Sequence, residues 1–184
     1  LEKLSVGSTV YYAGKGLFKV ESRETLVLET SGNFVSWRLR SVSRGNDVVY
    51  VGAVALAKGG IRVVSPIKEF EVALQALSDS PQRMPVAWSR RREFLDNMLR
   101  SVSPADVANV ARNTYGRARK DISLLSYGER ALGDAALRLL AEEYALLHQV
   151  TPDNAFERLF KRVSTDPAIK LSKERSLRPG STES

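Results

Sequence analysis

Residues 65–77 read SPIKEFEVALQAL, and within this stretch the hydrophobic pattern of the chain changes. After Ser65-Pro66, apolar side chains recur at the i, i+3, i+4, i+7 spacing of one helix face, at Phe70, Ala73, Leu74 and Leu77. Before this point, short apolar runs are separated by turn residues, as in β-strands. The stretch therefore divides the 184-residue chain into a β part and a helical part and predicts a two-module α+β fold.

The part before the division has the pattern of a small all-β module. Its candidate strands are rich in β-branched and aromatic residues and cover 6–12, 17–20, 25–30, 34–39, 48–51 and 61–64. Glycine-containing turns separate most of them. Short strands at such intervals predict a small barrel. We expect Trp37, in an alternating strand, to lie in the barrel core; the alternative is an exposed site of protein contact.

About five helices are predicted after the division. Ser103-Pro104 places a capping residue and a proline at one helix start, and Ser126 with Glu129 fits a capping box at another. The remaining helices begin near residues 67, 86 and 151. The sequence thus predicts a β module over 1–66 and a helical module over 67–164. The polar residues 165–184 are expected to form a flexible tail.

Positive charge gathers in the middle of the chain. The formal net charge is +7, and residues 83–120 hold nine basic and three acidic residues, a local charge of +6. Within them, Trp88 stands beside Arg90, Arg91 and Arg92. An arginine stays charged and is costly to bury unpaired, so Trp88 is expected at a surface that meets an anionic, flat partner. Nucleic acid fits both requirements, and a merely solvated helix face is the alternative.

Little in the sequence points to catalysis. There is no cysteine, and His148 is the single histidine, a composition that argues against a zinc site. The adjacent Glu142 and Glu143 point about 100° apart on a helix, so they do not converge as an acid–base pair. The longest apolar run, 48–57, contains Gly52 and is too short to span a bilayer. We therefore expect a protein that is not an enzyme and needs no cofactor.

Four motifs follow one another along residues 4–163. They are VGSTVYYAGKG (6–16), PVAWSRR (85–91), SPADVANVARNTY (103–115) and LSYGERAL (125–132). Together they resemble the CarD/CdnL family of bacterial transcription regulators. That family shows V-G-D-x-V-V-Y-P-x-x-G, then Pro-x-x-Trp-Ser-Arg-Arg at a helix start, then G-D-x-x-x-x-A-E-V-V-R-D-L and L-S-x-x-E-R-x-L.

The resemblance implies a division of labour between the two modules. In the family, a Tudor-like β module docks on the β subunit of RNA polymerase, and the helical module binds promoter DNA. A tryptophan wedges into the minor groove at the upstream edge of the melted region and stabilises the open complex. By motif, the wedge is Trp88, with Arg90 and Arg91 as phosphate contacts. Further DNA contacts are expected from the other basic residues nearby, Arg92, Arg117, Arg119 and Lys120.

The expected polymerase contact departs from the family pattern. Ala13 stands where the family has proline, and the family's polymerase-contacting arginines fall on Leu26 and Val51. The candidates to replace them are Arg23, Arg38 and Arg40. The expected partners are RNA polymerase, through its β subunit, and promoter DNA, without a membrane or a small-molecule substrate. The expected location is the cytoplasm, at the nucleoid. The alternative is an adaptor that binds no DNA and uses the barrel for a different protein.

Overall fold

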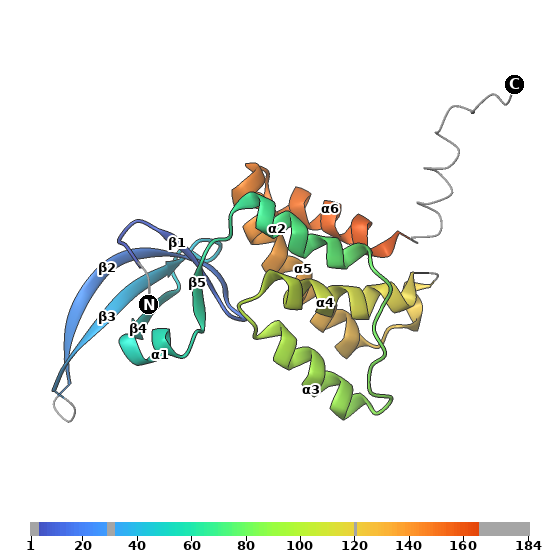
Figure 1. Ribbon diagram of the computed structural model, residues 1–184, viewed down its shortest axis with the longest axis horizontal. Coiled ribbons are helices and arrows are strands. Elements are labelled where there is room, and N and C mark those ends of the chain that lie inside the picture. Colours follow the sequence, from blue (N-terminus) through green and yellow to red (C-terminus); the bar gives the residue numbers. More distant parts are fainter. Residues whose placement is uncertain (1–3, 29–31, 120, 166–184) are drawn as a thin grey trace, which may run out of the picture.

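The computed structural model describes residues 4–28, 32–119 and 121–165. A β-sheet occupies one end of the molecule, and the helices that follow residue 66 occupy the other (Figure 1). Three parts of the sequence-based predictions lie outside the described residues: residues 29–30 of one predicted strand, Lys120, and residues 166–184 of the predicted tail.

The sheet has five antiparallel strands in the order β4-β3-β2-β1-β5. Their bounds are β1 (Thr9–Tyr12), β2 (Gly16–Leu28), β3 (Gly32–Ser41), β4 (Val48–Gly52) and β5 (Ile61–Val63). Two strands predicted within residues 17–30 are joined in β2. A register shift between Val20 and Ser22 lets β2 stay paired with β3 through the polar residues 21–24.

The predicted closed barrel is wrong, because the sheet is open and has β4 and β5 as its edges. Closure would require these edges to pair, whereas β4 runs directly into the short helix α1 (Ala53–Ala57), which the strand pattern does not predict. Leu56 and Trp37 pack instead against a small core. Its members are Val10, Phe18, Val20, Leu39 and Val51. Strand number and spacing do not determine the tilt and stagger that closure needs.

The five predicted helices are present. They are α2 (Ile67–Leu74), α3 (Trp88–Leu99), α4 (Pro104–Tyr115), α5 (Tyr127–His148) and α6 (Pro152–Ser164). The 3-10 turns η1 (Gln75–Ser78), η2 (Gly116–Ala118) and η3 (Ile122–Leu124) lie between them. The capping box of Ser126 and Glu129 starts α5 as predicted. Ser103 is at the N-cap of α4, but its side chain makes no capping hydrogen bond.

Helix α4 forms the centre of the helical part. It packs against α2, α3, α5 and α6, and its residues 107, 108 and 110–115 are all buried. The predicted stripe is buried in the same core through Phe70 and Leu74 of α2 and Leu77 of η1. Helix α3, in contrast, buries only Leu95 fully. It therefore lies at the margin of the bundle, as Figure 1 shows, with much of its surface exposed.

Two adjacent glutamates of α5 join the helices to the sheet. Arg62 of β5 donates through Nη1 and Nη2 to the two carboxylate oxygens of Glu143, at 2.7 and 2.6 Å. Glu143 is almost completely buried and also accepts the backbone N–H of Ser65. Glu142 accepts the N–H of Leu17, near the start of β2, at 2.9 Å. The two carboxylates thus diverge, as predicted, and each fixes a different strand of the sheet.

The contact of Glu142 with β2 explains why residue 16 is glycine. Gly16 has a φ of +93°, and a Cβ there would lie 2.2 Å from Oε2 of Glu142. Gly16→Ala should therefore strain the backbone and displace the carboxylate from Leu17. We expect the free energy of unfolding to fall by about 1–3 kcal/mol.

Chemical denaturation measures this effect, and Gly45→Ala provides the matched control. Gly45 has open space around its Cα, so its substitution should change stability by less than about 0.5 kcal/mol. Equal stability of the two variants would contradict the assigned role of Gly16.

Candidate nucleic-acid interface

Trp88 is the first residue of α3. Residues 81–87 lead into the helix without regular structure, and Ala87 at the N-cap is extended. The indole packs against the first turn of α5, where a Cβ on Gly128 would lie 2.8 Å from its Cζ2. Trp88 nevertheless remains 37% exposed. The ring is therefore held against the bundle without being sealed inside it.

Arg91 fixes the segment that carries Trp88. Its Nη2 pairs with Oε1 of Glu129 at 3.0 Å, and its Nη1 donates to the carbonyl of Val86 at 2.9 Å. The guanidinium also lies 5.4 Å from the centre of the Trp88 ring. Only 15% of the Arg91 side chain is exposed. Arg91 thus ties α5 to the segment before α3 and supports the indole from within the protein.

Glu129 connects the start of α5 with two arginines. Its Oε2 accepts the N–H and the hydroxyl of Ser126 at 3.0 and 2.8 Å, and its Oε1 pairs with Arg91 and, at 3.6 Å, with Arg117. Burial alone would raise the pKa of Glu129. The hydrogen bonds from Ser126 and the charges of Arg91 and Arg117 outweigh burial and lower this pKa below its ordinary value.

The other predicted DNA-binding arginines occupy different environments. Arg90 is exposed, and among the described residues it has no ion-pair partner. Arg92 is 65% exposed and pairs with Asp96 at 3.5 Å. Arg117 is partly exposed beside Glu129. Arg119 donates to the backbone carbonyls of Val163 and Asp79, both at 3.0 Å, and so holds the end of α6 against the segment after η1.

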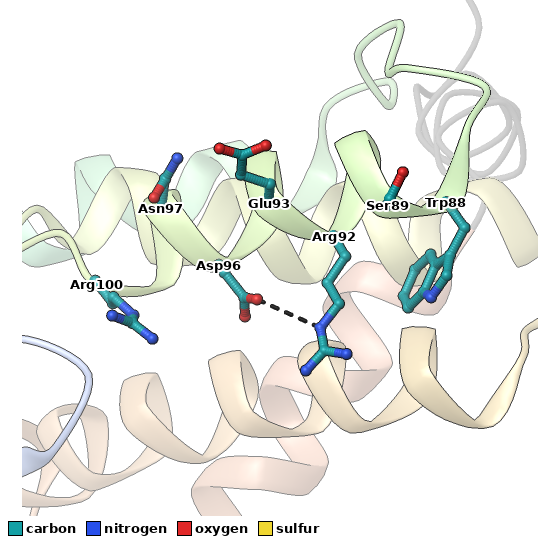
Figure 2. Close-up of a pocket in the computed structure, with 7 residues that line it drawn as sticks. All are labelled: Trp88, Ser89, Arg92, Glu93, Asp96, Asn97 and Arg100. Carbon is teal, nitrogen blue, oxygen red and sulfur yellow. Dashed lines mark ion pairs between the residues drawn. The ribbon is translucent and has the colours of Figure 1, made fainter.

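Two hollows meet at the indole. One runs along α3 and is lined by Trp88, Ser89, Arg92, Glu93, Asp96, Asn97 and Arg100. Figure 2 shows the indole on the same side of α3 as Arg92, Asp96 and Arg100, one helical turn apart from one another. The other lies toward α5 and is lined by Trp88, Arg91, Ser126, Tyr127, Gly128 and Glu129. A ligand that contacts the exposed part of the indole therefore meets either Arg92 and Arg100 together with the carboxylates of Glu93 and Asp96, or the start of α5.

Two exposed apolar residues near Trp88 are not among the DNA-binding residues that the sequence predicts. Tyr127 is 90% exposed and lines a hollow together with Trp88, and Val86 is 94% exposed. A signal for Tyr127 is present in the sequence, because it directly follows the capping serine of α5. Side chains at that position have no preceding helical turn to pack against.

The predicted polymerase-contacting residues lie on two faces of the sheet. Arg23 of β2 lies directly opposite Trp37 of β3, and its guanidinium lies 5.5 Å from the centre of the indole. Arg38 and Arg40 follow Trp37 and Leu39 in β3 and so point to the opposite face. Both arginines form ion pairs with Glu21. The Nε of Arg38 lies 3.2 Å from Oε2 of this carboxylate. The hydrogen bond from Arg40 is the main cause that lowers the pKa of Glu21.

The comparisons with known proteins identify the helical part. Residues 72–160 match the family model described as the CarD C-terminal domain. The match contains Trp88, its flanking arginines and the capping box of α5. No curated protein matches the chain. Among the described residues, no helix is long and apolar enough to cross a membrane, and no cluster of acidic residues and histidine could hold a metal ion.

Protonation of Glu129 should loosen the support of Trp88. Because the pKa of this carboxyl is lowered in the folded state, its stabilising effect is present above its unfolded pKa of about 4.5 and is lost as pH falls through the folded value. Glu129→Gln should reduce the free energy of unfolding at pH 7 by about 1–3 kcal/mol. The difference between the parent and this variant should shrink below about pH 4.5.

Denaturation at several pH values tests this expectation, with the exposed Glu157 of α6, substituted as Glu157→Gln, as the control. A difference between the parent and Glu129→Gln that stays constant from pH 7 to pH 3 would show that the charge of Glu129 does not carry the effect.

Proposed function

The chain belongs to the CarD/CdnL family, and on this premise we propose that it is a transcription regulator that stabilises the open promoter complex. The helical module, residues 67–164, contacts promoter DNA with the end that carries Trp88. The sheet module, residues 1–66, contacts the β subunit of RNA polymerase. The protein acts by binding alone, without a catalytic step, a cofactor or a small-molecule substrate.

The observation that carries this proposal is the supported but exposed indole of Trp88. Gly128 lets the ring approach the backbone of α5, and Arg91 holds the segment on which the ring is mounted. A wedge fixed in this way loses little conformational freedom on binding. Unstacking a base step costs a few kcal/mol, which a preorganised aromatic wedge can partly offset.

The surroundings of the indole favour a phosphate backbone. Arg90 and Arg92 are exposed on the same first turns of α3. The first turn of α3 contains no acidic residue and has no side-chain cap. The first N–H groups of the helix therefore have no acceptor within it. Both features attract anions. Arg90 and Arg92 are accordingly the proposed phosphate contacts, whereas Arg91 is proposed to position Trp88.

The proposed polymerase contact rests on the sheet. Because Arg38 and Arg40 share the face that points away from the small core, they form one surface that a flat partner can cover. Glu21 lies between them and orients both guanidiniums. Arg23 lies on the other face, beside Trp37, and is the weaker candidate for the same contact. The support for this half of the proposal is the VGSTVYYAGKG motif and the placement of these arginines.

The lifetime of open complexes formed by purified RNA polymerase, after addition of a DNA competitor, tests the proposed function. The parent protein should prolong this lifetime. Trp88→Ala should keep its fold and lose the effect, because the wedge is removed. Arg44→Ala, in the turn between β3 and β4, should behave as the parent. A Trp88→Ala variant as active as the parent would refute the wedge.

Salt titration of DNA binding separates the regulator from the adaptor. Replacing both Arg90 and Arg92 by alanine should weaken binding and reduce the slope of log affinity against log salt by about 2, because two phosphate contacts are lost. Absence of DNA binding by the parent even at low salt would instead favour the adaptor, in which the sheet holds a different protein.

A further inference from the structure

We propose that the hollow between Trp88 and the start of α5 receives an unpaired nucleobase, and that Tyr127 is the platform on which this base stacks. The inference rests on the proposed function and adds a second aromatic contact to it. Tyr127 is the first residue of α5 and is 90% exposed, although it stands next to Gly128, on which the indole packs. Both aromatic residues line the same hollow.

Most polar groups of this hollow already have partners within the protein. The hydroxyl and the N–H of Ser126 donate to Glu129. The terminal nitrogens of Arg91 are bound to Glu129 and to the carbonyl of Val86, and its Nε is buried without a hydrogen-bond partner. A ligand that enters the hollow therefore meets mainly aromatic surface. Stacking, which requires no specific hydrogen-bond pattern, is the interaction that such a surface offers.

The charge around the hollow identifies the ligand as part of a polyanion. The one carboxylate that lines it, Glu129, is buried and lies between Arg91 and Arg117. An apolar peptide would gain nothing from these arginines, whereas a strand with an unpaired base presents a flat ring and phosphates together.

A stacked position for Tyr127 requires a base that is free of its partner strand. The ring of Tyr127 lies at the rim of the hollow, and a paired base exposes only its edges in the grooves. A base at the border of a melted segment exposes its face. The proposed platform thus favours DNA with a junction between duplex and single strand over a continuous duplex.

The test compares two DNA probes of the same length, one a complete duplex and the other with an unpaired base at the junction. Tyr127→Ala should weaken binding to the junction by about tenfold and leave binding to the duplex within twofold, since stacking on one base contributes on the order of 1.4 kcal/mol, a factor of ten. Tyr127→Phe retains the ring and should bind as the parent. Leu124→Ala, which removes another exposed apolar side chain of the same region, is the matched control.

A 2-aminopurine at the unpaired position gives a second measurement. The parent should quench its fluorescence by stacking, and Tyr127→Ala should restore it. Equal loss of binding to both probes, or no loss with either, would overturn the platform. Trp88→Ala, measured alongside, distinguishes the two proposals. If Trp88→Ala weakens junction binding and Tyr127→Ala does not, only the platform fails; if Trp88→Ala has no effect, the proposed function fails as well.

Discussion

The carboxylate of Glu129 fixes the part of the molecule on which the proposed function depends. It closes the capping box of α5, and it pairs with Arg91. Arg91 in turn holds the carbonyl of Val86 and lies near the face of the Trp88 ring. One buried charge thus links the start of α5, the segment before α3 and the indole. Without it, the irregular segment that precedes Trp88 would lose its tie to α5.

The three consecutive arginines have different roles because successive residues on a helix point about 100° apart. Only one of them can face the bundle, and that one is Arg91. Arg90 and Arg92 remain exposed to a partner. The sequence shows the run but not its orientation, so it predicted Arg91 as a phosphate contact together with Arg90. The same holds for Arg119, whose hydrogen bonds to backbone carbonyls depend on the approach of α6 and the segment after η1.

Local signals predicted the helical part well and the sheet less well. The capping box at Ser126 and the stripe of Phe70, Leu74 and Leu77 depend on neighbouring residues only, so they are visible in the sequence. Closure of the sheet depends on strands distant in the chain, and α1 lies within an apolar run that fits a strand equally well. The exposed position of Trp88 was predictable from its charged neighbours, whereas the support from Gly128 was not, because it joins two helices.

The fluorescence of Trp88 in the presence of junction DNA tests the central claim most directly. The chain contains two tryptophans, so Trp37→Phe leaves Trp88 as the single emitter. Binding is followed in parallel by the anisotropy of labelled DNA. If the indole enters the distorted duplex, its emission should be quenched in proportion to the DNA bound. Saturating binding with unchanged Trp88 emission would contradict the account.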